Sequence, residues 1–243
     1  MKNGVIWLLL ATFCAVVSLA SWEREAADVS GEMKMTLQEK YIALTFDDGP
    51  HPVYTPRLLD GLKARGAKAT FFLVGVMAEE SRDIVVRMQK EGHQVGNHTY
   101  EHVDLSQSSA DKAIESIEKN NELLCGILDE GCYWVRPPWG YITEKVKNAI
   151  DVPMVYWSVD TKDWLTLDVE KVVDAALQAE DGDIVLMHDI YPTTVEAALD
   201  FVDIMQSRGY QFVTVEELLE INGVDISEGL LYRKGDGSEV FLQ

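Results

Sequence analysis

The chain has 243 residues, a length that suits one α/β domain with short extensions. Its 47% hydrophobic and 26% charged residues are typical of a globular protein and exclude collagen, low-complexity disorder and a multi-pass membrane protein. The formal net charge of −20 would repel a phosphate backbone, so nucleic acid is not an expected partner. Neutral molecules and metal cations are easier ligands for such a chain.

The N-terminal segment looks like an export signal. Its apolar run, residues 4–20, follows Lys2 and ends in Ser18-Leu19-Ala20, with small residues where a signal peptidase cleaves. We therefore expect a signal peptide over residues 1–20 and a secreted protein that does not bind membranes. A retained signal anchor is the alternative, although the run is at the short limit of a bilayer span. Residues 21–39 are charged and weakly patterned, which is typical of a linker.

Two of the three cysteines would remain after cleavage at Ala20. An even number suits an exported protein, and we expect Cys125 and Cys132 to form a disulfide that ties a helix end to the next strand. Two free thiols are the alternative.

From Lys40 onwards, apolar strands alternate with amphipathic helices. The segments YIALTF, ATFFLVG, HQVGN, CYWVR, MVYWSVD, DIVLMH and QFVTV are typical of strands. Helices are predicted after them over residues 55–65, 77–91, 109–128, 143–150, 168–179, 194–208 and 216–221. Such βα pairs predict an α/β fold with about seven parallel strands, closed or nearly closed into a barrel over residues 40–221. Residues 222–243 would be an extension, in which Gly235-Asp236-Gly237 turns a small hairpin.

Polar residues follow five of the predicted strands, and in a barrel the carboxyl ends of all strands meet at one rim. His98 and His102 are four residues apart, which on one helical turn would place both imidazoles on one face. Neutral imidazole binds zinc and other divalent transition metals, and a carboxylate from Asp47-Asp48 would complete a His₂Asp set with an open position for water. Because successive side chains diverge, one aspartate should bind the metal and the other should face the reacting water.

Five segments together resemble the polysaccharide deacetylase (NodB homology) family, carbohydrate esterase family 4. They are YIALTFDDGP, GNHTYEH, RPPWG, VDTKDW and IVLMHD, in this order over roughly residues 40–220. The resemblance implies a distorted (β/α) barrel and the metal-dependent removal of acetyl groups from amino sugars in a polymer, such as chitooligosaccharide or the N-acetylglucosamine of peptidoglycan. One divalent ion is implied, with zinc as the first expectation and cobalt, manganese or nickel as alternatives. We expect a monomer whose partner is the polysaccharide.

The resemblance also implies a role for individual residues. Asp47 looks like the catalytic base and Arg136 like its partner, whereas His188 looks like the general acid and Asp163 like its partner. The implied metal ligands are Asp48, His98 and His102. Neither Pro137 nor Pro138 has an N–H, so the amide of Trp139, where the family usually has Tyr, is the first that can donate to an oxyanion. Trp164 and Leu186 would wall the pocket for the acetyl methyl group.

Other interpretations stay open. An acetylxylan esterase belongs to the same family, and a glycan-binding module without activity is an alternative of another class. His98 to His102 also spells HxxEH, a metalloprotease motif with Glu101 as base, but that motif needs a helix and Gly96-Asn97 lies just upstream. His51 and His93 are expected to be structural or on the surface, and Trp134 and Trp157 to lie in the core. Tyr141 could stack on a sugar or cap the groove.

Overall fold

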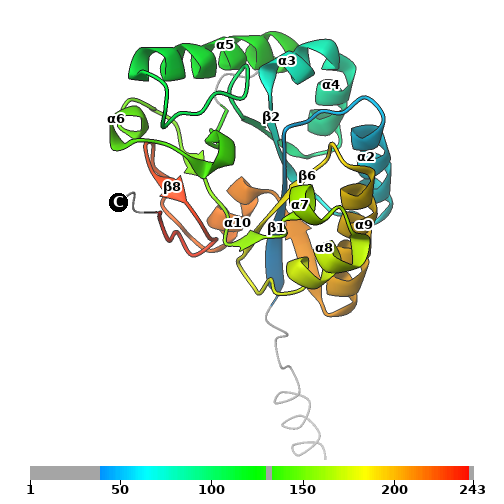
Figure 1. Cartoon of the computed structure of the whole chain (residues 1–243). Helices are drawn as coiled ribbons and strands as arrows, with labels where there is room; N and C mark the ends of the chain where they lie inside the picture. The colour runs from blue at the N-terminus through cyan, green and yellow to red at the C-terminus, as the bar shows by residue number, and fades with distance from the viewer. Residues whose placement is uncertain (1–38, 130–132, 241–243) are drawn as a thin grey trace, which may run out of the picture. The chain divides into compact units, whose positions relative to one another are not determined.

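The computed structural model describes residues 39–129 and 133–240, and its centre is a six-stranded parallel sheet (Figure 1). The order along the sheet is β3-β2-β1-β6-β5, and β7 also pairs with β1. The strands are β1 (Lys40–Asp47), β2 (Thr70–Leu73), β3 (Gln94–Asn97), β5 (Val159–Asp160), β6 (Ile184–His188) and β7 (Tyr210–Val213).

Strand β1 organises this sheet because it pairs with three others. On one edge its first half, Lys40 to Ala43, pairs with β7 and its second half, Thr45 to Asp47, pairs with β2. On the other edge β6 runs beside it, with Asp47 opposite His188 in the register. The two predicted catalytic side chains therefore start from neighbouring positions at the carboxyl end of the sheet.

A second parallel sheet joins β4 (Met154–Val155) to β8 (Leu231–Tyr232). Single bridges at Val135 connect it to the first sheet, through Asn97 on one side and Met154 on the other. The fold is thus the predicted barrel-like α/β fold, although within residues 39–129 and 133–240 no continuous ladder closes a barrel.

Two predicted strands are shorter than the sequence indicates. Of the predicted strand CYWVR, the described residues 133–136 contribute only the bridges at Val135, because Pro137 and Pro138 cannot donate to a ladder. The segment at residues 154–160 is divided into β4 and β5. At the division, the carbonyls of Val155 and Tyr156 accept hydrogen bonds from the guanidinium of Arg136.

The part of the chain after residue 221 contributes to the packing. Leu231 and Tyr232 of β8 are buried, and an antiparallel bridge between Tyr232 and Glu239 forms the small hairpin predicted at residues 235–237. The domain boundary drawn at residue 221 stays a prediction.

Helices surround the sheet as the alternating pattern predicts. They are α2 (Tyr54–Ala64), α3 (Gly75–Glu80), α4 (Arg82–Lys90), α5 (Ala110–Leu128), α6 (Glu144–Lys147), α7 (Asp163–Thr166), α8 (Val169–Ala176), α9 (Pro192–Ser207) and α10 (Val215–Ile221). The hydroxyls of Ser109, Thr143 and Thr214 and the carboxylate of Asp168 cap the N-termini of α5, α6, α10 and α8.

The predicted helix over residues 77–91 is in fact two helices that meet at Ser81, whose φ of −131° and ψ of 42° are not helical. The predicted helix over residues 143–150 is shorter than expected, and the short α7 was not predicted. None of the helices in the described parts of the chain is long and apolar enough to span a bilayer. The predicted signal peptide and linker lie outside the described residues.

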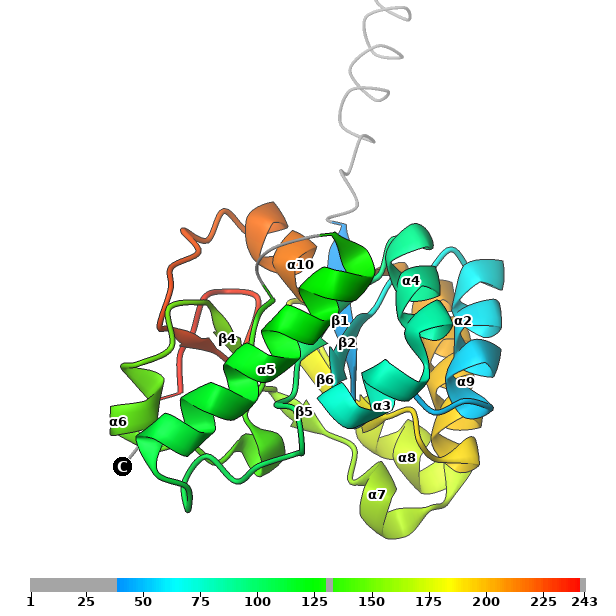
Figure 2. The same cartoon turned by 90° about the horizontal axis from the view of Figure 1, so that it is seen from above.

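Alternation along β1 separates the core from the site. Ile42, Leu44 and Phe46 face the largest core cluster, in which α2, α4, α8 and α9 pack on the sheet (Figure 2). Thr45 and Asp47 point to the opposite face, as the period of two along a strand requires. That face is the barrel interior, where the side chain of Arg136 is completely buried.

Candidate active site

The loops at the carboxyl ends of the strands enclose a cavity of about 480 Å³. It contains most of the predicted site residues, in agreement with the rule that barrel chemistry collects at this rim. The lining residues are Asp47, Asp48, His98, His102, Trp139, Tyr141, Trp157, Asp160, Trp164, Leu186, His188 and Tyr191.

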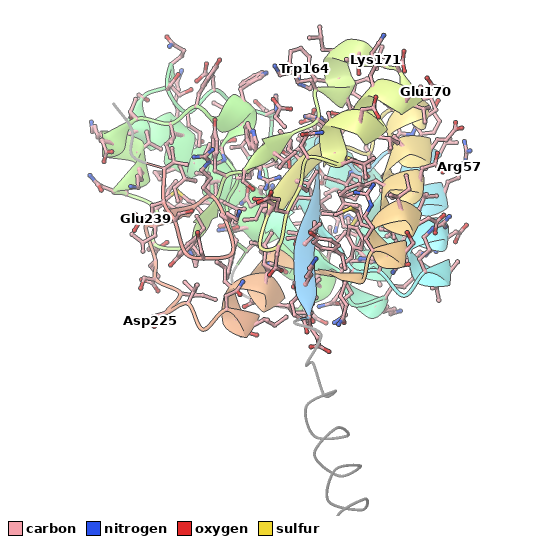
Figure 3. All side chains as sticks on the ribbon, turned by 90° about the horizontal axis from the view of Figure 1, so that it is seen from below. Arg57, Trp164, Glu170, Lys171, Asp225 and Glu239 are labelled. Atoms are coloured by element: carbon pink, nitrogen blue, oxygen red, sulfur yellow. The ribbon has the colours of Figure 1, made fainter. Side chains whose placement is uncertain are left out.

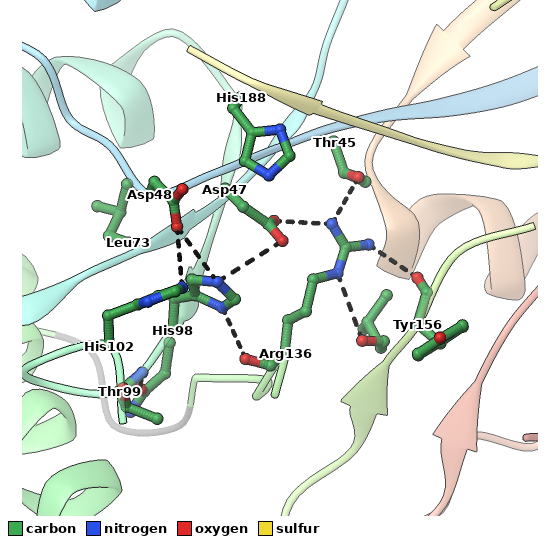
Figure 4. Close-up of polar contacts among 12 residues, drawn as sticks. Thr45, Asp47, Asp48, Leu73, His98, Thr99, His102, Arg136, Tyr156 and His188 are labelled. Atoms are coloured by element: carbon green, nitrogen blue, oxygen red, sulfur yellow. Dashed lines mark hydrogen bonds and ion pairs between the residues drawn. The ribbon is translucent and has the colours of Figure 1, made fainter. Parts of the chain in front are cut away.

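Asp48, His98 and His102 come together as a group that could hold a metal ion, with one ligand atom from each within 4.8 Å of the others (Figure 4). Asp48 Oδ1 lies 3.2 Å from His102 Nε2 and 3.5 Å from His98 Nε2. This oxygen is buried, yet within the described part of the chain it accepts no hydrogen bond. A buried carboxylate oxygen without a donor is costly, so the donor set fits a cation.

The tautomer of His98 agrees with a role as ligand. Its Nδ1 is 2.7 Å from the carbonyl oxygen of Arg136, which can only accept, so Nδ1 carries the proton and Nε2 offers a lone pair to the site. Burial lowers the pKa of His98 despite the nearby charges of Asp47 and Asp48, which favours the neutral ring. Burial opposes ionisation of Asp48, but the imidazoles of His102, His98 and His188 outweigh it and lower its pKa to about 2.

The expectation that His98 and His102 share a helical turn is wrong. Residues 98–102 form a loop, in which Thr99 and His102 have positive φ angles of 63° and 54°. The side chain of Asn97 shapes this loop, because its Oδ1 accepts hydrogen bonds from the N–H of Thr99 and from Asn120 Nδ2. The loop brings both imidazoles to Asp48 without a helix, and the context required by the HxxEH protease motif is absent from this segment.

Asp47 stands beside the metal group but has a different partner. It is 3% exposed, and its Oδ1 accepts a hydrogen bond of 2.8 Å from Arg136 Nη1. The same nitrogen donates to Thr45 Oγ1, and the guanidinium lies 4.2 Å from the centre of the Phe72 ring. Asp47 and Arg136 thus form a buried ion pair at the edge of the metal group.

His188 faces the same cavity from β6, and its partner is the fully buried Asp163. His188 Nδ1 is 2.8 Å from Asp163 Oδ1, and Asp163 Oδ2 accepts from the His188 N–H and from Thr194 Oγ1. Burial would lower the pKa of His188, but the hydrogen bond and the charge of Asp163 outweigh it and raise this pKa to about 9. The imidazole is therefore a protonated donor at neutral pH.

The backbone of Trp139, the predicted oxyanion donor, lies in the left-handed region. Its φ is 54°, and the backbone hydrogen bonds of its turn are donated by Gly140 and Tyr141, so its own N–H takes no part in them. Its ring is 54% exposed and lies edge-on to His102 at 4.2 Å between centroids.

Trp164 and Leu186 also line the cavity, as predicted from the resemblance. Leu186 is 4% exposed, whereas Trp164, in α7, is half-exposed and is labelled at the same edge of the view in Figure 3 as Glu170 and Lys171 of α8. The exposed Tyr141 adds a further aromatic wall.

Sequence reasoning missed three lining residues. Trp157 was expected in the core, yet it is only partly buried, stacks on Tyr156 at 4.0 Å and lines the cavity. Asp160 is the last residue of β5 and Tyr191 lies just after β6, so the rim rule could have assigned both to the site. Trp134 is buried, as expected.

The side chains predicted to play no chemical part lie outside this cavity. His51 Nδ1 accepts hydrogen bonds from the N–H groups of Val53 and Tyr54. His93 is buried and its Nδ1 accepts from the N–H of Ala69. The proposed protease base, Glu101, lines a separate cavity beside α5. Cys132 lies outside the described residues, so its pairing with the partly buried Cys125 stays a prediction.

The described residues thus bring a buried carboxylate, an imidazole with a raised pKa and a potential metal site together at one rim of a parallel α/β fold. Comparisons with known proteins identify the family. The family model for polysaccharide deacetylase matches residues 34–155, and relatives with more than 30% identity match over most of the chain. The chain belongs to the polysaccharide deacetylase family.

Three relatives show the range of this similarity. The peptidoglycan-N-acetylmuramic acid deacetylase PdaC of Bacillus subtilis is 36% identical over 82% of this chain and 43% of its own length. A peptidoglycan-N-acetylglucosamine deacetylase of Bacillus cereus is 38% identical over 74% of this chain and 89% of its own. The cobalt complex of a family 4 acetyl xylan esterase from Clostridium thermocellum has a TM-score of 0.76 at 33% identity and covers 80% of this chain and 98% of its own. The chain spans less than half the length of the first curated relatives that it matches.

Proposed function

We propose that the protein hydrolyses N-acetyl groups of amino sugars in a polysaccharide, with one divalent metal ion. The observation that carries this proposal is the pairing of Asp47 with Arg136 and of His188 with Asp163 at facing positions of one cavity, beside the Asp48–His98–His102 group. Two titratable groups whose surroundings favour opposite charge states are suited to act as base and acid. A binding module would need neither.

Asp48, His98 and His102 would hold the metal. When bound, a divalent ion polarises a carbonyl and makes a water more acidic. Zinc is our first choice, and the cobalt in the esterase structure shows that another divalent ion binds in a relative.

The other residues would move protons and stabilise charge. Asp47 takes the proton of the attacking water, and Arg136 keeps this carboxylate ionised beforehand. The N–H of Trp139 donates to the oxyanion of the tetrahedral intermediate. His188 gives its proton to the departing amine, while Asp163 fixes the ring through Nδ1. Trp164 and Leu186 enclose the acetyl methyl group.

Peptidoglycan is the substrate that the relatives favour, because several are named as deacetylases of its N-acetylglucosamine or N-acetylmuramic acid. A chitooligosaccharide deacetylase of Sinorhizobium fredii, 36% identical over 62% of this chain, supports the second choice. A peptidoglycan substrate also agrees with export by residues 1–20 and action outside the cytoplasm, which we propose together with it.

The test is acetate release by metal-reconstituted protein from a panel of peptidoglycan, chitooligosaccharides and acetylxylan. We expect release from the amino sugar polymers in the presence of zinc or cobalt, and none after treatment with a chelator. Release from acetylxylan alone would replace the N-deacetylase with an O-esterase. If the metal-bound protein released acetate from none of these substrates, this result would support the glycan-binding module.

The raised pKa of His188 makes a pH dependence testable. A general acid must be protonated, so kcat/KM is expected to fall about tenfold per pH unit as the pH rises through the pKa of His188. NMR titration of the metal-free protein should place this pKa near 9. In Asp163→Asn the charge that raises it is gone, so the pKa and the alkaline limb should both move to lower pH, and kcat should fall roughly 10²- to 10⁴-fold. An unchanged limb in Asp163→Asn would show that another group is the acid.

A further inference from the structure

Asp189, which follows His188 at the end of β6, is a buried carboxylate with too few partners. It is 0% exposed, and Thr55 Oγ1 donates a hydrogen bond to its Oδ2. Its Oδ1 has no hydrogen-bond partner in the described part of the chain, and no ion pair joins Asp189 to a cationic side chain there, although the charge of the neighbouring His188 acts on it. Such burial is costly unless a positive charge lies nearby.

The carboxylate lies directly against the loop that carries Asp48. A Cβ at Gly49 would be 2.3 Å from Asp189 Oδ1 and 2.7 Å from Oδ2, so only glycine allows this contact. At the other end of the loop, Thr55 Oγ1 accepts a hydrogen bond of 2.7 Å from the N–H of His51 while it donates to Asp189. Asp189 thus touches the loop at both ends.

We propose that Asp189 is a positioning residue of the metal site. Its side chain holds the segment from Asp48 to Thr55 in place. Its carboxylate also places a negative charge behind Asp48, which the bound cation compensates. The proposal rests on the metal dependence proposed above. It explains why a carboxylate occupies this position although its free oxygen makes no hydrogen bond. Burial, and to a smaller extent the charge of Asp48, raise the pKa of Asp189 to about 7 in the absence of metal, although the bond from Thr55, a bond from the backbone N–H of Asp189 itself and the charge of His188 oppose this shift.

The test compares Asp189→Asn with wild type at pH 8, using the full chain. Asparagine keeps the acceptor for Thr55 and removes the charge. The zinc Kd, measured by competition with a chromophoric chelator, should rise about 10- to 100-fold, the usual effect of losing an outer partner of a metal site. The Tm of the metal-free protein should stay equal or rise, because an uncompensated buried charge is gone. A purely structural role predicts a lower Tm instead.

A matched control lies at the other end of β6. Asp183 is also buried, but Lys234 Nζ is 3.0 Å from its Oδ1, and Ser158 donates to the same oxygen. Asp183→Asn should therefore lower the Tm of the metal-free protein and leave the zinc Kd unchanged.

Two further variants keep the proposal falsifiable if Asp189→Asn does not fold. Thr55→Val removes the hydroxyl that links Asp189 to the loop and should raise the zinc Kd severalfold, whereas Thr55→Ser keeps it and should bind as wild type does. A wild-type Kd in Asp189→Asn, or in Thr55→Val where the first variant is unfolded, would overturn the proposal while leaving the metal-dependent function intact. Wild-type protein that binds no zinc, cobalt or manganese would overturn both.

Discussion

The Asp47→Asn variant should keep its metal and lose its hydrolytic activity. Asparagine has nearly the same size and still accepts a hydrogen bond from Arg136, but it cannot take a proton from water. We expect kcat to fall roughly 10²- to 10⁴-fold, the usual contribution of a general base, with metal content unchanged in elemental analysis. The variant therefore distinguishes Asp47, the proposed base, from its neighbour Asp48, the proposed metal ligand.

The matched control for this variant is Glu101→Ala, since Glu101 lines a different cavity and should be dispensable. If Asp47→Asn lost its metal, or Glu101→Ala lost its activity, the assignment of base and ligand would be wrong and the protease interpretation would return.

Asp48→Ala should lose metal and activity together. Its oxygen is the only carboxylate ligand in the Asp48–His98–His102 group, and its loss leaves only the two imidazoles. We expect the metal affinity to fall by more than the about 10- to 100-fold typical of removing an outer partner, and acetate release to fall with it. Equilibrium dialysis and acetate assay measure the two effects on the same samples.

His51→Ala is the control for Asp48→Ala, because His51 is the nearest histidine outside the cavity and its imidazole accepts only backbone hydrogen bonds. It should change metal content and acetate release by no more than severalfold. Full metal occupancy in Asp48→Ala would contradict the ligand assignment.

The sequence predicted the fold and the site through different physical signals. Buried parallel strands are nearly continuous apolar runs, so β1, β2 and β6 could be recognised directly, and the polar residues after them marked the rim. The predicted starts of α5 and α10, at residues 109 and 216, also lie within one residue of the observed starts.

What the sequence could not show depends on contacts between distant segments. The division of residues 154–160 follows from hydrogen bonds to Arg136, which is some twenty residues away in the chain. The approach of His98 and His102 depends on positive φ angles at Thr99 and His102, which their residue types do not predict. The short α7 starts at Asp163, whose carboxylate is hydrogen-bonded to His188 Nδ1.

Arg136 has a structural role in addition to its contact with Asp47, the proposed base. Its guanidinium joins Thr45 and Asp47 of β1 to the carbonyls of Val155 and Tyr156, so it fastens the main sheet to the segment where the barrel interior has no continuous ladder. Lysine, with one nitrogen in place of a planar fork, cannot make these four bonds. Exchange of Arg136 would therefore loosen the scaffold as well as remove the partner of Asp47, which leaves the loops around the cavity as the freer route to new substrates.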